Sequence, residues 1–174
     1  MTRPRSRAPE RAPALIRPAA ARDRAAIERL VGAIAAEVYG HLFRAAPPRP
    51  DGKWAQALVA EIDGRLVAVM VADDDWIEDL WVARECRRRG VGSCLLAAGE
   101  RQIAARGCAR AHLRVIAENH AARRFYARHG WSEAETYPHE TWGFAMVDMI
   151  KRLPSAPPGG GADRIASGRD QARA

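Results

Sequence analysis

The chain has 174 residues, enough for one domain that buries about two thirds of its extended surface without metals or disulfides. Apolar residues make up 48% and charged residues 28%, and no run of 18 apolar residues occurs, which excludes a membrane-spanning helix. The N-terminal stretch lacks the apolar core of a secretory signal, and the three cysteines form no C-x-x-C pair. We therefore expect reduced thiols and a cytoplasmic protein without a membrane partner.

Much of the net charge of +7 lies at the two ends of the chain. Residues 1–13 hold four arginines against one glutamate, and residues 154–174 hold three arginines against two aspartates. Both ends are rich in Pro, Gly or Arg and have too few apolar residues to become ordered. We predict two disordered tails around a folded domain at 14–153. A nucleic-acid-binding arm is the alternative for the first tail, but nucleic acid is not the partner that we expect.

A strand and a helix open the predicted domain. Residues 14–17 form a short strand before a proline, and Asp23 can cap a helix because apolar residues after it recur on one helical face. Two strand-like runs follow at 54–62 and 65–72. The Asp-Gly pair between these runs is a strong signal for a type I′ hairpin.

Strands and helices alternate in the second half. The expected segments are a strand at 76–82, a helix at 91–106, a strand at 109–116, a helix from Asn119 to 129–130, and strands at 131–136 and 142–151. The strands at 76–82 and 109–116 are joined through a helix, and such a crossover connects parallel strands.

The most informative stretch lies between the strand at 76–82 and the next helix. It reads Arg87-Arg88-Arg89-Gly90-Val91-Gly92-Ser93. Glycines there let the backbone turn tightly and approach a ligand, and the free N–H groups of the first helical turn favour a phosphate or pyrophosphate. The spacing R-x-x-G-x-G matches neither a P-loop nor the dinucleotide-binding pattern. From this stretch alone, a tight turn without a ligand is the alternative.

Two segments resemble the motifs of one family. Ile77-Glu78-Asp79-Leu80-Trp81-Val82, followed by R-x-x-G-x-G-x-x-L-L, looks like the acetyl-CoA motif of the GNAT superfamily of N-acetyltransferases. Asn119-x-x-Ala122-x-x-Phe125-Tyr126-x-x-x-Gly130-Trp131 is similar to the second signature of that superfamily, with Trp131 where Phe is commoner. The resemblance covers about residues 14–153. It implies an α+β GNAT fold, with a mixed, mostly antiparallel central sheet, a splayed parallel strand pair and flanking helices.

The resemblance also implies acetyl-CoA as the acyl-donor cosubstrate. The backbone of the strand would hold the pantetheine arm, the loop would hold the pyrophosphate, and the second signature would reach the thioester. The implied coenzyme-binding positions are Leu80, Trp81, Val82, Arg87, Arg88, Arg89, Gly90, Val91, Gly92, Ser93, Asn119 and Tyr126. No metal is expected, because the five histidines lack metal-ligand spacing.

Direct acetyl transfer needs a neutral amine, so a group near the thioester must take the amine proton. Glu78 is the first candidate for this base. It lies two residues before Leu80 on the same face of the strand, so it should point toward the cleft. Asp79 is the second, since a bulge would reverse the alternation of the strand. Either carboxylate could instead only bind an arginine. Tyr126 is the candidate general acid, and its alternative is a packing role beside Phe125.

The acceptor is predicted from charge. Five carboxylates at 73–75, Glu78 and Asp79 gather near the predicted site and would attract a small cationic amine, such as a polyamine or an aminoglycoside. A protein or peptide acceptor is the alternative, but peptide N-terminal acetyltransferases of the superfamily usually carry a Glu at the position of Arg114. A non-catalytic CoA-binding sensor is a further alternative. Many members of the superfamily dimerise, and the sequence leaves a homodimer open.

Overall fold

The computed structural model describes residues 13–42, 53–141 and 143–154. In these ranges the strands are β1 (Leu15–Pro18), β2 (Leu58–Ile62), β3 (Arg65–Asp73), β4 (Trp76–Val82), β5 (Arg110–Ile116), β6 (Ser132–Pro138) and β7 (Ala145–Arg152). The α-helices are α1 (Arg24–Tyr39), α2 (Val91–Ala105) and α3 (His120–Arg128). Apart from their innermost residues, the tails predicted at 1–13 and 154–174 lie outside the described ranges.

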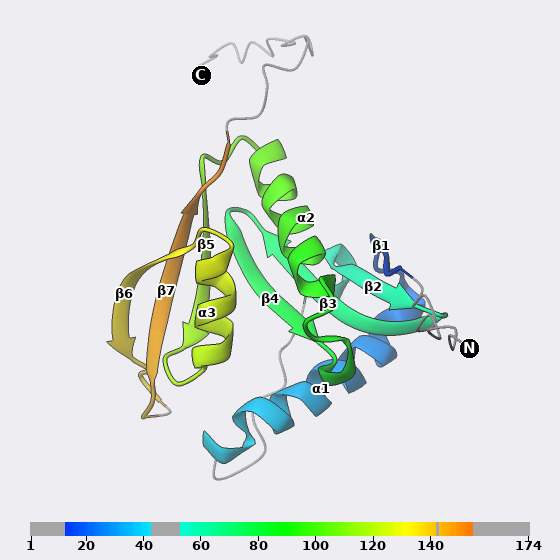
Figure 1. The fold of residues 1–174 in the computed structure, drawn as a ribbon, viewed down its shortest axis with the longest axis horizontal. Coiled ribbons are helices and arrows are strands. Elements are labelled where there is room, and N and C mark those ends of the chain that lie inside the picture. Colours follow the sequence, from blue (N-terminus) through cyan, green and yellow to red (C-terminus); the bar gives the residue numbers. More distant parts are fainter. Residues whose placement is uncertain (1–12, 43–52, 142, 155–174) are drawn as a thin grey trace, which may run out of the picture.

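The strands form one sheet in the order β1-β2-β3-β4-β5-β7-β6 (Figure 1). Neighbouring strands run antiparallel except for β4 and β5, which run parallel. The predicted mixed, mostly antiparallel sheet is therefore confirmed. The parallel pair is the one that the intervening helix α2 required.

Helices cover both faces of this sheet. On β3, Ala68, Met70 and Ala72 are buried in the core that α2 and α3 close, whereas Val69 and Val71 are buried in the core that α1 closes. Because successive strand residues point to opposite faces, α1 lies on one face and α2 and α3 on the other. No helix in the described ranges is both long and apolar enough to cross a membrane.

Two predicted turns are confirmed, whereas one predicted strand starts later than expected. Asp63 and Gly64 have φ angles of 50° and 73°, and a type I′ hairpin requires both to be positive. Helix α2 ends before Gly107, whose φ of 87° is typical of the residue after a helix. The strand expected from residue 54 begins only at Leu58, because Trp54–Gln56 form a short 3₁₀ turn.

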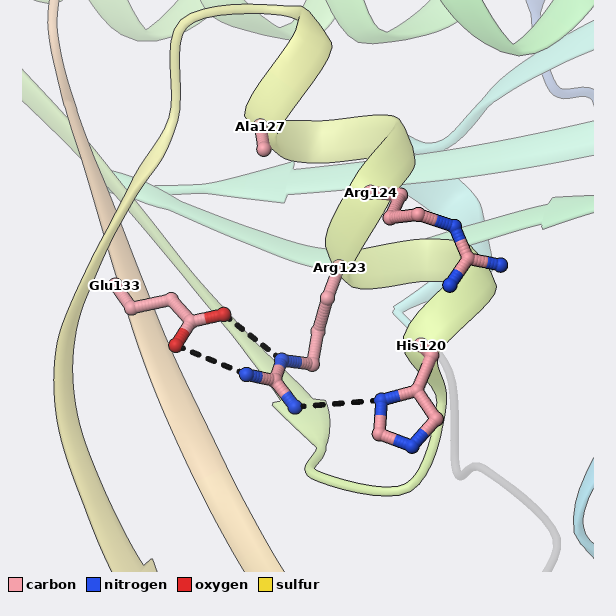
Figure 2. A pocket seen from close by; sticks show the side chains of 5 residues that line it. All are labelled: His120, Arg123, Arg124, Ala127 and Glu133. Atoms are coloured by element: carbon pink, nitrogen blue, oxygen red, sulfur yellow. Dashed lines mark hydrogen bonds and ion pairs between the residues drawn. The ribbon is translucent and has the colours of Figure 1, made fainter.

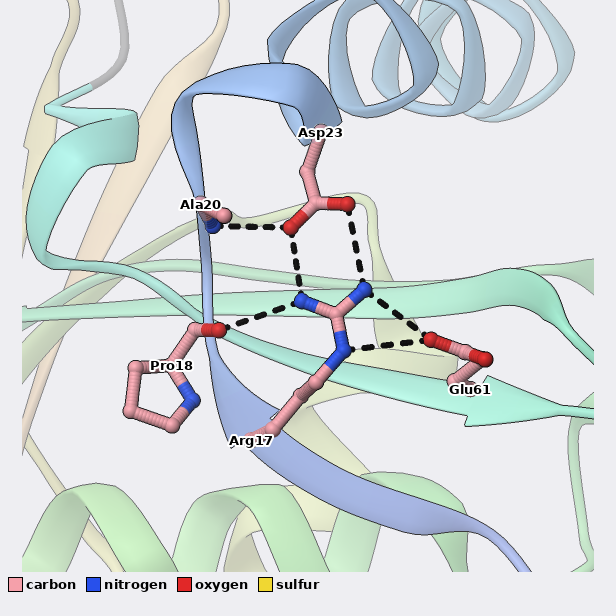
Figure 3. Close-up of polar contacts among 5 residues, drawn as sticks. All are labelled: Arg17, Pro18, Ala20, Asp23 and Glu61. Atoms are coloured by element: carbon pink, nitrogen blue, oxygen red, sulfur yellow. Dashed lines mark hydrogen bonds and ion pairs between the residues drawn. The ribbon is translucent and has the colours of Figure 1, made fainter.

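Asp23 precedes α1, but its carboxylate makes no capping bond to that helix. A 3₁₀ turn at Ala21–Asp23 comes first, so the carboxylate faces back and accepts from the Ala20 N–H at 2.8 Å. It also binds both terminal nitrogens of Arg17 at 2.6 and 3.1 Å, and Arg17 donates to Glu61 on β2 (Figure 3). Asp23 therefore stands at the predicted N-cap position of α1, but its side chain does not cap the helix and instead ties the start of α1 to β1 and β2.

This cluster predicts an acid-sensitive contribution to stability. The Arg17 guanidinium holds the pKa of Asp23 at about 2, below its usual 3.8, so the contribution is complete above about pH 4 and is lost as pH falls towards 2. Asp23→Asn should lower the free energy of unfolding by about 1 to 2 kcal/mol at neutral pH. The difference from wild type should shrink below about pH 4, as urea unfolding at several pH values would measure.

Asp63→Asn is the matched control, because Asp63 lies in the exposed hairpin turn, where Asn tolerates a positive φ equally well. This variant should show no such pH-dependent difference. An Asp23→Asn variant that followed wild type at every pH would show that the cluster does not stabilise the fold.

Candidate active site

The pairing of β4 with β5 stops after two residue pairs. Trp76 lies opposite His112 and Ile77 opposite Leu113, and the described residues of β4 beyond Ile77 have no partner on β5. β4 stays paired with β3 as far as Val82, and β5 stays paired with β7 along its length. The two strands diverge, so each has one edge whose backbone groups lack a strand partner (Figure 1).

A β-bulge lies where this pairing stops. Ala72 on β3 faces Ile77 and Val71 faces Asp79, so Glu78 is an extra residue in β4. A bulge bends its strand and increases its twist, which carries the rest of β4 away from β5. Glu78 itself is exposed, whereas Asp79 is half-buried. A bulge in this strand was the condition for preferring Asp79 to Glu78 as the base. That bulge is present.

Asp79 has a direct partner on its own strand. The Trp81 indole Nε1 donates a hydrogen bond to Asp79 Oδ1 at 2.6 Å. Burial raises the pKa of Asp79, the Trp81 bond opposes this rise, and the nearby charge of Glu78 adds to it. A carboxylate with a raised pKa is a better proton acceptor near neutral pH than an ordinary one.

The second signature places Asn119 and Tyr126 beside the diverging strands. Asn119 caps α3, because its Oδ1 accepts from the Ala122 N–H at 3.1 Å. Tyr126 is buried, and burial raises the pKa of its hydroxyl, with the negative charges of Tyr39 and Asp79 adding to the rise. Asp79 and Tyr39 both contact Trp81, the first through its carboxylate and the second through its ring, so these two side chains lie together on β4 beyond the point where it leaves β5.

Tyr39, the last residue of α1, is the member of this group that the sequence did not indicate. Its hydroxyl accepts a hydrogen bond from Asn119 Nδ2 at 2.8 Å, and its ring packs edge-on against Trp81 with centroids 6.1 Å apart. Tyr39 belongs to no motif and ends an ordinary amphipathic helix. Only the tertiary contact with α3 distinguishes it from other helix-end aromatics.

The loop before α2 has the backbone expected of an anion site. Gly90 is the N-cap of α2 with a φ of 82°, and Cys94 N–H bonds back to the Gly90 carbonyl. The N–H groups of the three residues between them, 91–93, therefore precede the first α-helical hydrogen bond. A side chain at Gly92 would touch Val82 and Phe125, so the helix start lies close to both β4 and α3.

The three arginines of the loop differ in their engagement. Arg87 donates from Nε to the Val82 carbonyl at 3.1 Å and pairs with Glu37 on α1 at 3.2 Å. It therefore braces the loop against β4 and α1. Arg88 and Arg89 are exposed.

A hollow on the outer face of α3 lies apart from this region. Its volume is about 210 Å³, and it is lined by His120, Arg123, Arg124, Ala127 and Glu133. Arg123 donates to both carboxylate oxygens of Glu133 at 2.8 and 3.0 Å, while Arg124 points away (Figure 2). α3 turns Tyr126 inward and these side chains outward, so the hollow belongs to the contact between α3 and β6.

The arrangement of loop, splayed strands and Tyr126 agrees with a match to a family model. Residues 33–131 match the model of the acetyltransferase (GNAT) family. The chain belongs to this family. It is accordingly an acyltransferase, an N-acetyltransferase that uses acetyl-CoA.

A relative agrees with this assignment, and several solved structures share the fold. An uncharacterized N-acetyltransferase of Methanocaldococcus jannaschii is 39% identical over 106 residues, which cover 56% of this chain and 67% of the relative. A Salmonella typhimurium structure described as a putative acetyltransferase with acetyl-CoA aligns with a TM-score of 0.67 and 17% identity, covering 86% of this chain and all of that one.

A ribosomal-protein-alanine N-acetyltransferase of Brucella melitensis aligns with a TM-score of 0.66 and 20% identity, covering 80% of this chain and 99% of that one. A nourseothricin acetyltransferase aligns with a TM-score of 0.63 and 23% identity, covering 81% and 99% of the two chains. These structures share the fold with this chain, and their different acceptors show that the fold does not select the acceptor.

The contact between Trp81 and Asp79 yields a prediction. Trp81→Phe removes the indole donor that stabilises the carboxylate, so the pKa of Asp79 should rise further above its ordinary value. Carbon-13 NMR of the aspartate carboxyl groups over a pH titration would measure the shift. Trp76→Phe, on the same strand but packed against His112, is the control and should leave the Asp79 titration unchanged. An equal effect of both variants would contradict this assignment.

Proposed function

We propose that the protein transfers the acetyl group of acetyl-CoA directly to the primary amine of a small cationic molecule, of the polyamine or aminoglycoside type. The observation that carries the choice of acceptor is the set of carboxylates at the start of β4. Asp73 pairs with Lys53, and Asp75 lies 3.7 Å from His112. Asp74 and Glu78 are exposed, and neither has an ion pair within the described ranges. Such unneutralised carboxylates attract a cation.

A peptide acceptor is less well supported by the surroundings of Arg114. The resemblance to peptide N-terminal acetyltransferases predicts a glutamate at this position. Here the Arg114 guanidinium lies between the rings of Trp76 and Tyr137, at 5.4 and 5.3 Å, and binds both carboxylate oxygens of Asp148. A neutralised, stacked arginine offers no proton acceptor to a peptide amine.

The proposed coenzyme contacts follow the unpaired backbone. Residues 80–82 on β4 would bind the pantetheine arm as an added strand, and the N–H groups at 91–93 would bind the diphosphate at the start of α2. Arg88 and Arg89 would add charge at the rim, while Arg87 holds the loop in place. Asn119 and Tyr126 would lie beside the thioester.

In the proposed reaction the amine nitrogen attacks the thioester carbonyl carbon, and the carbon–sulfur bond breaks. We propose that Asp79 takes the amine proton, with the exposed Glu78 as the alternative, and that Tyr126 donates a proton or hydrogen bond to the departing thiolate. An ordinary tyrosine, with a pKa of about 10, is a weaker acid than a thiol at about 8.5. Burial raises the pKa of Tyr126 further, which favours a hydrogen bond to the departing sulfur over complete proton transfer unless burial destabilises the thiolate as strongly.

We also propose that the reaction takes place in the cytoplasm. Cys86, Cys94 and Cys108 are all unpaired, and Cys94 is exposed. Free thiols are typical of proteins in reducing compartments.

An acetylation screen would test the proposed activity. The purified chain is incubated with acetyl-CoA and polyamines, aminoglycosides, lysine or basic peptides, and released thiol is measured. We expect thiol release with small polycationic amines and little with peptides. Turnover confined to peptide N-termini would contradict the proposed acceptor class, and coenzyme binding without turnover on any amine would favour the sensor alternative.

Gly90→Ala should weaken CoA binding. Its φ of 82° strains any other L-residue by about 1 to 3 kcal/mol, and it holds the first amides of α2 in place. Gly107→Ala is the matched control, because Gly107 has a similar φ of 87° at the opposite end of the same helix. Isothermal titration with CoA should show a loss of about tenfold or more for Gly90→Ala only. Equal losses would indicate general destabilisation.

The base assignment predicts different pH profiles for two neighbouring carboxylates. Below the raised pKa of Asp79, its protonated carboxyl cannot accept the amine proton, so kcat/KM should fall as pH decreases. Asp79→Asn should lower kcat/KM about 10²-fold and remove this acidic limb. Glu78→Gln should retain the limb when rates are measured from about pH 5 to 9. The reverse result would assign the base to Glu78.

A further inference from the structure

Two helices on opposite faces of the sheet bring Tyr39 to the diverging strands. Tyr39 ends α1, and its ring packs on Trp81 of β4, which lies on the α1 face of the sheet. Its hydroxyl reaches Asn119 at the start of α3, 80 residues further along the chain. Burial raises the pKa of the Tyr39 hydroxyl, so the phenol keeps its proton at neutral pH.

The hydrogen bonds around Asn119 fix the direction of that proton. Asn119 Oδ1 accepts from the Ala122 N–H at 3.1 Å, so the other end of the amide is the NH₂ group. This NH₂ donates to the Tyr39 oxygen at 2.8 Å. The Tyr39 O–H must then point elsewhere, and within the described ranges the structure records no acceptor for it.

Tyr39 links the two parted strands, because its ring packs on Trp81 of β4 and its hydroxyl binds Asn119, which follows the end of β5 at Ile116. Tyr39 and Asn119 also line a cavity of about 180 Å³ between the end of α1 and the start of α3. A polar group that enters this space can therefore reach the Tyr39 proton.

We propose that Tyr39 is a further catalytic residue, whose hydroxyl donates a hydrogen bond to the carbonyl oxygen of the acetyl thioester. This inference rests on the proposed function. When the amine attacks, the carbonyl oxygen takes on negative charge, and a donor fixed beforehand stabilises that charge without reorganisation. The proton stays on Tyr39 throughout. Because its oxygen already accepts from Asn119, the phenol is a stronger donor than an isolated one.

Three groups then have separate tasks. Tyr39 serves the carbonyl oxygen, Tyr126 serves the sulfur, and Asp79 serves the amine. Trp81 holds two of them, since it bonds to Asp79 and packs against Tyr39. Asn119 orients Tyr39 and caps α3 with the same amide group.

Tyr39→Phe tests the hydrogen bond directly, because it keeps the ring against Trp81 and removes only the hydroxyl. Acetyl-CoA labelled with carbon-13 at the acetyl carbonyl is bound to each protein, and the carbonyl stretch is recorded by difference infrared spectroscopy. In wild type the stretch should move to lower frequency than in free acetyl-CoA, since hydrogen bonding weakens the carbonyl double bond. In Tyr39→Phe much of that displacement should vanish, while the dissociation constant of acetyl-CoA stays unchanged.

Tyr126→Phe is the matched control, since Tyr126 is assigned to the sulfur and its loss should leave the carbonyl stretch displaced. With an active amine, Tyr39→Phe should lower kcat about 10²-fold or more, with KM little changed. The inference would be overturned if Tyr39→Phe left the carbonyl stretching frequency unchanged and Tyr126→Phe returned it to the value of free acetyl-CoA. The proposed function would then remain intact. Failure of wild type to bind acetyl-CoA would overturn both.

Discussion

The bulge at Glu78 is the constraint on which the rest of the site depends. β4 must stay bonded to β3 to complete the sheet, yet it must leave β5 to expose backbone for a ligand. One extra residue in β4, placed just after Ile77, allows both. The ladder with β3 resumes at Asp79, while the added bend and twist end the pairing with β5. The backbone polar groups released along β4 and β5 then need another partner or water.

The same bulge determines how the side chains after Ile77 are divided between the two faces of the sheet. Without it, strict alternation from Ile77 would put Asp79 on the face of Ile77, in the core that α2 and α3 close. With it, Asp79 faces the side of Trp81 and Tyr39, and Glu78 is left exposed. The two carboxylates are adjacent in sequence but differ in environment. Asp79 is suited to proton transfer by its burial, and Glu78 is suited to attracting a cation by its exposure.

Three helices supply the remaining parts of the proposed site. α2 contributes the free N–H groups of its first turn. Gly90 adopts the positive φ needed at the start of this helix, and Arg87 ties the preceding loop to β4. α3 contributes Tyr126 through a helix start that Asn119 fixes, and α1 contributes Tyr39 from the opposite face of the sheet. The Arg17–Asp23–Glu61 cluster holds the start of α1 against the sheet edge, and the Tyr39–Asn119 bond holds its end. α1 is therefore fixed at both ends.

Local signals let the sequence alone determine a large part of this protein. Several features that depend on residues close together in the chain agree with their predictions. They are the Asp-Gly hairpin, Gly107 after α2, the Asn119 cap and the strand at 76–82. The loop of residues 87–93 was likewise evident from its own glycines and arginines. The parallel pairing of β4 and β5 followed from the connection between them.

Tertiary structure decided the features that depend on distant residues. A bulge is a mismatch between two strands, so β4 alone could not show whether Glu78 or Asp79 turns inward. Asp is a common N-cap residue, but the Asp23 carboxylate binds Arg17 on β1 instead of the helix backbone. Tyr39 belongs to no motif and meets Asn119 across 80 residues of chain. Such contacts form only when the packed sheet brings α1 and α3 together.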